Sequence, residues 1–180
     1  MRSPRIRWAV ICIAVLVLAA DQVSKALAVA AAPSGSRGGL VRAGIVRNTG
    51  ASFGIGTGYP VLITAVAAAV LAAAVIWLAR TRRPGAALCL AVVAGGAAGN
   101  LADRLLRSPG PGRGAVVDWI HVAGYPATFN LADVAIRAGA VGALVAMLAA
   151  GRRRNRRIAT PGADFPAGGR HDAANHAQQG

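Results

Sequence analysis

Residues 59–79 read YPVLITAVAAAVLAAAVIWLA, a run of 21 residues without a charged side chain. As an α-helix rising about 1.5 Å per residue, this run is about 31 Å long, which matches a bilayer hydrocarbon core of about 30 Å. The whole chain has a similar character, because 55% of its residues are hydrophobic and only 14% are charged. Ordinary soluble domains carry about 25% charged residues. The sequence therefore predicts an integral membrane protein.

Three further apolar runs reach spanning length when they extend past a few polar residues. Their uncharged cores are residues 8–20, 86–102 and 138–151. The first can continue toward residue 32, the second to residue 106, and the third can begin near residue 129. The apolar residues are mainly Ala, Val and Leu, and only 4% of the chain is aromatic, which favours helices over sheets. We predict an all-α fold of four transmembrane helices, the first ended by residues 33–35 (PSG).

The first apolar run has an alternative interpretation as a cleavable signal peptide. It follows three arginines, it is 13 residues long, and residues 26–32 are rich in alanine, all of which are typical of such peptides. However, Asp21 and Lys25 are spaced to pair on one helix face. Such a pair has a purpose only if the segment remains in the mature protein, so we expect it to be retained.

The distribution of arginine predicts the orientation. Dense clusters occur in residues 2–7, 80–83 and 152–157, whereas arginines are sparse in residues 33–58 and 107–128. Because basic residues near span ends favour the cytoplasm, both termini are expected there. We expect the last cluster to anchor the chain on anionic membrane lipid, and we predict no nucleic-acid partner despite the net charge of +14.

The chain is expected to comprise a membrane domain, residues 1–157, and a disordered basic and polar cytoplasmic tail, residues 158–180. The tail is rich in Gly, Ala, Asn, Gln and His and has no apolar pattern.

Carboxylates are few and unusually placed. The chain contains no Glu and six Asp, four of which lie in or beside apolar runs: Asp21, Asp103, Asp118 and Asp133. A carboxylate at the bilayer centre costs about 2.5–3.5 kcal/mol, which pairing, water access or function must offset. One explanation is that these aspartates are interfacial caps or ion pairs: Asp21 with Lys25, Asp133 with Arg137, and Asp103 near a helix end beside Arg104. Asp118 has no such neighbour, which favours a functional role.

Polar and small residues of the third and fourth spans concentrate at the same level. Gly95 and Gly99 form a GxxxG pattern that lets another helix approach closely. Asn100, Asp103 and Arg104 follow on one helix face, and residues 130 and 133 are likewise three apart. A water-accessible reaction site can therefore form near the extracytoplasmic ends of these helices.

Other chemistries fit less well. Residues 50–54 (GASFG) match the GxSxG pattern of serine hydrolases, but no strand–helix alternation supports it. His121, His171 and His176 are too few and scattered for a metal site. A small proton-coupled transporter or channel needs polar residues at several depths, and a scaffold packed through glycines leaves the Asp unexplained.

Five motifs, in order, resemble the lipoprotein (type II) signal peptidase family of bacteria. They are residues 21–25 (DQVSK), 48–54 (NTGASFG), 95–104 (GGAAGNLADR), 116–119 (VVDW) and 129–133 (FNLAD). The resemblance implies an aspartic endopeptidase of the bacterial plasma membrane that removes the signal peptide of a diacylglyceryl-modified prolipoprotein, cutting before the lipidated Cys. It also implies a small extracytoplasmic β element between the first two helices, and a second extracytoplasmic element between the last two.

The resemblance assigns the catalytic role to Asp118 and Asp133. The residues that it makes supporting or substrate-binding are Asp21, Lys25, Asn48, Gly99, Asn100, Arg104 and Asn130. No metal or cofactor is implied, and the active form is expected to be a monomer with its site near the extracytoplasmic face. Residues 105–115 are longer than is usual in the family, and Trp119, Val134 and Arg137 depart from its pattern.

Overall fold

A computed structural model describes residues 3–31, 41–51 and 55–159 of the chain. In order, its elements are α1 (Pro4–Ala31), β1 (Val41–Asn48), α2 (Pro60–Arg80), α3 (Pro84–Leu106), β2 (Val116–Val122), β3 (Thr128–Phe129) and α4 (Leu131–Ala159). By compactness the chain divides into Met1–Met147 and Leu148–Gly180. Within the second unit, the described residues are the end of α4.

All four predicted spans are helices in the described part of the chain. Each is long and apolar enough to cross a membrane by length and composition. Three of them begin at a proline, whose fixed φ suits the first helical position and whose missing N–H would have no partner there. The all-α membrane fold is thus confirmed. The predicted end of the first helix at residues 33–35 lies outside the described residues.

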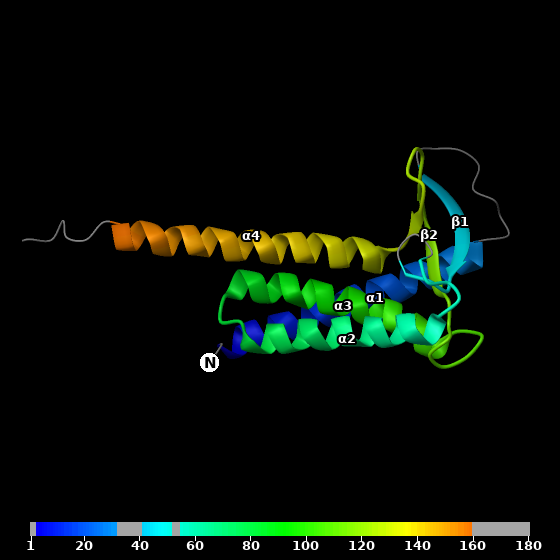
Figure 1. The fold of residues 1–180 in the computed structure, drawn as a ribbon, viewed down its shortest axis with the longest axis horizontal. Helices are drawn as coiled ribbons and strands as arrows, with labels where there is room; N and C mark the ends of the chain where they lie inside the picture. Colours follow the sequence, from blue (N-terminus) through cyan, green and yellow to red (C-terminus); the bar gives the residue numbers. More distant parts are fainter. Residues whose placement is uncertain (1–2, 32–40, 52–54, 160–180) are drawn as a thin grey trace, which may run out of the picture. The chain divides into compact units, whose positions relative to one another are not determined.

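α3 is the central helix. Over half of its most apolar 18-residue window is buried, 56%, against 11% in each of the other three helices. α1 and α2 pack on it, and Figure 1 shows these helices running alongside one another. Large apolar side chains on α1, α2 and α4, such as Trp8, Leu62 and Leu144, are exposed. An apolar surface of this kind is suited to contact with lipid.

Two glycines of α3 permit close helix contacts. A Cβ at Gly95 would lie 2.6 Å from the Ala14 carbonyl oxygen of α1, and a Cβ at Gly96 would lie 2.7 Å from the Ala132 carbonyl oxygen of α4. The predicted GxxxG approach is therefore confirmed, and α1 is the helix that makes it.

A three-stranded antiparallel sheet lies at one end of the helices (Figure 1). Its order is β1–β2–β3, with Val46 opposite Asp118 and Ile120 opposite Phe129. The predicted β element between the first two helices is present as β1. Its partners come from the segment between α3 and α4, so the two extracytoplasmic elements expected from the sequence form one sheet.

Candidate active site

Asp118 lies within β2 and is only 2% exposed. Its Oδ1 accepts a hydrogen bond from Asn130 Nδ2 at 2.6 Å, and its Oδ2 accepts one from Asn48 Nδ2 at 3.1 Å. The pKa of Asp118 is raised to about 6, mainly by burial and also by the nearby charge of Asp133, while the hydrogen bonds from Asn48 and Asn130 oppose the increase. This carboxyl group can therefore hold a proton at mildly acidic pH.

Asp133 lies in the first turn of α4 and forms a reciprocal cap with Asn130. The Asn130 side-chain oxygen accepts the Asp133 backbone N–H at 3.0 Å, and Asp133 Oδ2 accepts the Asn130 backbone N–H at 3.3 Å. Such an exchange satisfies two N–H groups that a helix start leaves without partners. Asn130 therefore holds both candidate catalytic residues, because its amide also donates to Asp118.

Asn100 of α3 links Asp133 to a buried lysine. Its Nδ2 donates to Asp133 Oδ1 at 2.9 Å, and its Oδ1 accepts from Lys25 Nζ at 3.0 Å and from Asn130 Nδ2 at 3.1 Å. These bonds fix the amide orientation, because its oxygen faces donors and its nitrogen faces a carboxylate.

Lys25 is the centre of a buried ion cluster between α1 and α3. It is fully buried and lies 2.8 Å from Asp21 and 2.9 Å from Asp103. Asp103 also binds Arg107 at 2.6 Å, and Asp21 accepts the backbone N–H of Ala132 at 2.9 Å. The cluster therefore connects α1, α3 and the start of α4. Its members Asp21, Lys25 and Asp103 are not among the residues that line the cavity described below.

Gly99 and Gln22 complete this packing. A Cβ at Gly99 would overlap the Asp21 carboxylate. Gln22 Nε2 lies within hydrogen-bond distance of three acceptors: the Gly99 carbonyl oxygen at 3.1 Å and the carboxylates of Asp21 and Asp103 at 3.2 Å each. Any side chain at position 99 would displace α1 from the cluster.

Arg104 faces the other way from its neighbour Asp103. Its Nη2 donates to the Gly50 carbonyl oxygen at 2.6 Å. Among the described residues, its buried Nη1 has no hydrogen-bond partner. A guanidinium N–H without a partner beside a cavity is suited to bind a carbonyl oxygen of a ligand.

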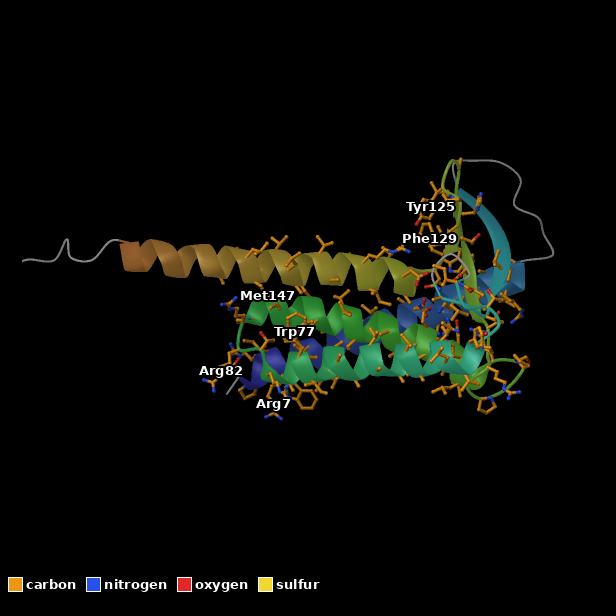
Figure 2. All side chains as sticks on the ribbon, viewed as in Figure 1. Arg7, Trp77, Arg82, Tyr125, Phe129 and Met147 are labelled. Carbon is orange, nitrogen blue, oxygen red and sulfur yellow. The ribbon has the colours of Figure 1, made fainter. Side chains whose placement is uncertain are left out.

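A cavity of about 220 Å³ brings these groups together. Its polar wall contains Asn48, Asn100, Arg104, Asp118 and Asp133. Its apolar wall is formed largely by α2 and by Tyr125 and Phe129, whose rings meet edge to face at 5.9 Å. Figure 2 shows these two aromatic residues at the sheet end of the molecule, away from Arg7 and Arg82.

The structure sorts the predicted site residues into three places. The cavity wall holds both catalytic candidates together with Asn48, Asn100 and Arg104. Asn130 is buried behind that wall and bonds to both aspartates. Asp21, Lys25 and Gly99 belong to the ion cluster. Ser52, on which the serine-hydrolase alternative depends, lies outside the described residues.

Ion pairing holds for Asp21 and Asp103, whereas Asp133 forms a helix cap with Asn130. Asp21 pairs with Lys25 as proposed. Asp103 does lie near the end of α3 beside Arg104, but successive helix residues point in different directions, and Asp103 binds Lys25 and Arg107. Among the described residues, neither Asp118 nor Asp133 belongs to an ion pair.

Several contributors were missed from the sequence. The i,i+4 spacing of Asp103 and Arg107 was a usable signal. Gln22 lies within the DQVSK motif of residues 21–25, but its role depends on the contact between α1 and α3. Phe129 belongs to the FNLAD motif but was not assigned to the site, and Tyr125 carries no local signal. Both join the cavity only when β2, β3 and α2 assemble.

Comparison with known proteins identifies relatives over most of the chain. Residues 13–149 match the family described as Signal peptidase (SPase) II. A protein of Mycobacterium avium (strain 104), named lipoprotein signal peptidase, is 41% identical over 145 residues, which are 78% of this chain and 79% of the relative. A Rhodococcus jostii (strain RHA1) protein of the same name is 45% identical over 134 residues, 72% of this chain and 67% of the relative.

Two solved structures are also similar. A bacterial membrane enzyme determined by the in meso method at 2.3 Å resolution gives a TM-score of 0.67 at 27% identity, covering 77% of this chain and 87% of that one. Another, determined by the same method at 1.9 Å, gives a TM-score of 0.63 at 26% identity, covering 77% and 92%.

Proposed function

Because the chain belongs to the signal peptidase II family, we propose that it is a membrane aspartic endopeptidase that removes the signal peptide from diacylglyceryl-modified prolipoproteins. The cut lies immediately before the lipidated Cys. The observation that carries the mechanism is that Asp118 and Asp133 line one cavity and share Asn130 as a hydrogen-bond partner. Among the described residues neither carboxylate forms an ion pair, so both are available for proton transfer.

Hydrolysis by this pair needs one proton between the two carboxyl groups, because close like charges cannot both ionise. The ionised carboxylate takes a proton from water, whose oxygen attacks the scissile carbonyl carbon. The protonated carboxyl donates to the carbonyl oxygen. Collapse breaks the C–N bond as the amide nitrogen is protonated, which releases the signal peptide and leaves a free amino group on the Cys. No covalent intermediate forms.

Supporting residues orient the two carboxyl groups. Asn48 and Asn130 hold Asp118, and Asn100 holds Asp133. Arg104 Nη1 has no hydrogen-bond partner among the described residues. In the proposed complex it donates to a backbone carbonyl of the substrate. Pre-positioned donors and acceptors of this kind lower the cost of reorganisation during reaction.

The enzyme lies in the bacterial plasma membrane with both termini in the cytoplasm and the site near the extracytoplasmic face. This orientation is supported by the arginines at the end of the helices opposite the sheet, where Figure 2 labels Arg7 and Arg82. We propose that the enzyme acts as a monomer, because both aspartates meet their amide partners within one chain and need no second copy to do so.

A proton-coupled transporter or channel is not supported. Such a protein needs ionisable groups along a path through the membrane. α2 has none between Pro60 and Ala79. The charged residues that line the cavity lie in β2 or near the helix ends next to it: Asp118 in β2, Arg104 near the end of α3, and Asp133 and Arg137 near the start of α4.

The proposal is tested by incubating the purified protein in detergent with a diacylglyceryl-modified prolipoprotein and, in parallel, with the same prolipoprotein lacking the lipid. Mass spectrometry of the products locates the cut. We expect loss of the signal peptide, with a new amino-terminal Cys, from the lipidated substrate. Failure to cleave it, with the protein folded, would contradict the proposal.

A further inference from the structure

An apolar groove continues from the catalytic cavity along the helices. A second cavity of about 290 Å³ lies beyond the first, and Val70 of α2 lines both. The groove is bounded by one face of α2 and one face of α4, and α3 residues such as Leu90, Val93 and Ala97 also line it. On each helix the lining residues recur at three- and four-residue steps: 63, 66, 67, 70, 73, 74 and 77 on α2, and 133, 136, 137, 140, 143, 144 and 147 on α4. Such spacing defines a continuous helix face.

Arg137 is the one charged residue on these two faces besides Asp133. It follows Asp133 by one helical turn, on the same face and about 6 Å further along the helix axis from the sheet end. Among the described residues, no protein group forms an ion pair with it. Arg137 is an exposed residue that lines the catalytic cavity, so its guanidinium is accessible to a ligand that enters the groove beside the catalytic residues.

We infer that the Arg137 guanidinium binds the ester carbonyl oxygens of the substrate's diacylglyceryl group. This inference rests on the proposed function. The lipid is attached to the sulfur of the Cys that follows the scissile bond, so the Cys side chain and the glyceryl carbons separate its two ester groups from the reacting carbonyl. When the scissile bond is at Asp118 and Asp133, chains directed along the groove place these esters beside Arg137.

The surrounding surface fits the lipid better than the peptide. Beyond Arg137 the α4 face contains only Ala140, Ala143, Leu144 and Met147, and the opposing α2 face is equally apolar. These walls offer dispersion contacts to acyl chains and almost no hydrogen-bonding groups to a peptide backbone. A guanidinium presents several N–H donors in one plane, which suits two neighbouring carbonyl oxygens. Arg137 is thus a substrate-recognition residue that acts outside the proton-transfer chemistry.

The test compares two substrates and two readouts. One prolipoprotein carries the natural diacyl ester lipid, and the other carries a dialkyl ether lipid of equal chain length, which lacks the carbonyl oxygens. For Arg137→Gln we expect KM for the ester substrate to rise about tenfold, the loss of one charge-assisted hydrogen bond, with kcat unchanged. For the ether substrate the wild type and Arg137→Gln should be equal. Arg137→Lys should restore part of the ester preference.

A binding measurement separates this inference from the proposed function. The probe is an S-diacylglyceryl cysteine amide without a scissile peptide bond, titrated against the detergent-solubilised protein. We expect about tenfold weaker binding to Arg137→Gln and unchanged binding to Arg82→Gln, whose side chain lies at the opposite end of the helices (Figure 2). Equal binding to wild type and Arg137→Gln, or an equal loss with ester and ether lipids, would overturn the inference. Absence of cleavage by the wild type would instead contradict the proposed function.

Discussion

At the residue scale, the site depends on how differently its buried aspartates are partnered. Asp21 and Asp103 share Lys25, so their charges are compensated. Asp118 is as deeply buried but receives only neutral amide donors, and burial raises its pKa to about 6. A carboxyl group of this kind can carry the shared proton under mildly acidic conditions, whereas an exposed aspartic acid has lost its proton above about pH 4.

This pKa predicts the pH dependence of cleavage. Activity needs one proton on the Asp118–Asp133 pair, and a raised pKa retains that proton up to about pH 6, so kcat/KM should fall as pH rises through this value. The Asn48 hydrogen bond lowers the pKa. Asn48→Ala should therefore move the falling limb to higher pH while reducing the maximal rate.

The control for this profile is Asn155→Ala, in the arginine-rich segment after the fourth span. It should leave the limb in place. A limb that stays fixed, or moves to lower pH, in Asn48→Ala would show that Asp118 does not control the titration.

At the element scale, α3 positions the site because it contacts partners on several sides. Gly95 and Gly99 face α1, Gly96 faces α4, and Asn100 and Arg104 face the cavity. α3 therefore supplies the glycines that pack closely against α1 and α4 and, directly after them in the sequence, the polar side chains that line the cavity. The periodic spacing of these residues could be predicted from the sequence, because it depends only on the 3.6-residue helical repeat.

Gly99 provides a test of this packing. In Gly99→Ala the new methyl group overlaps the Asp21 carboxylate, so α1 must shift away from α3 and weaken the contacts of Lys25. We expect a loss of about 1–3 kcal/mol in the free energy of unfolding, typical of overpacked cores, and a lower thermal midpoint in detergent.

The matched control is Gly58→Ala, where an added Cβ meets no atom within 4 Å. It should melt with the wild type. Equal midpoints for Gly99→Ala and Gly58→Ala would refute the close contact between Gly99 and Asp21.

At the scale of the whole molecule, the four helices and the polar end were predictable, whereas the pairing of the strands and the addition of Asp103 to the Asp21–Lys25 pair were not. Uncharged length identifies a span directly. The pairing of β1 with β2 joins residues about seventy positions apart, as in Val46 with Asp118, and no local pattern specifies such a partner. Likewise Asp103 could be placed on a helix face, but its choice of Lys25 over Arg104 depended on the position of α1.

The topology predicts the outcome of reporter fusions. Fusions after residues 45 and 112 should report an extracytoplasmic location, and fusions after residues 83 and 165 a cytoplasmic one, because the dense arginine clusters favour the cytoplasm. The amino terminus of the mature protein, read by sequencing, is the control. Cleavage near residue 32 would remove Asp21 and Lys25 and contradict both the topology and the ion cluster.

The central claim is that Asp118 and Asp133 act as one catalytic unit, and single-turnover cleavage of the lipidated prolipoprotein tests it most directly. Asp118→Asn and Asp133→Asn keep the size and polarity of the side chains but cannot share the proton. Each should lower the rate by about a thousandfold or more at an unchanged thermal midpoint, and the double variant should be scarcely slower than either single variant. Asp164→Asn, in the tail after α4, should cleave at the wild-type rate. Cleavage at near wild-type rate by Asp118→Asn or Asp133→Asn would contradict the aspartic mechanism.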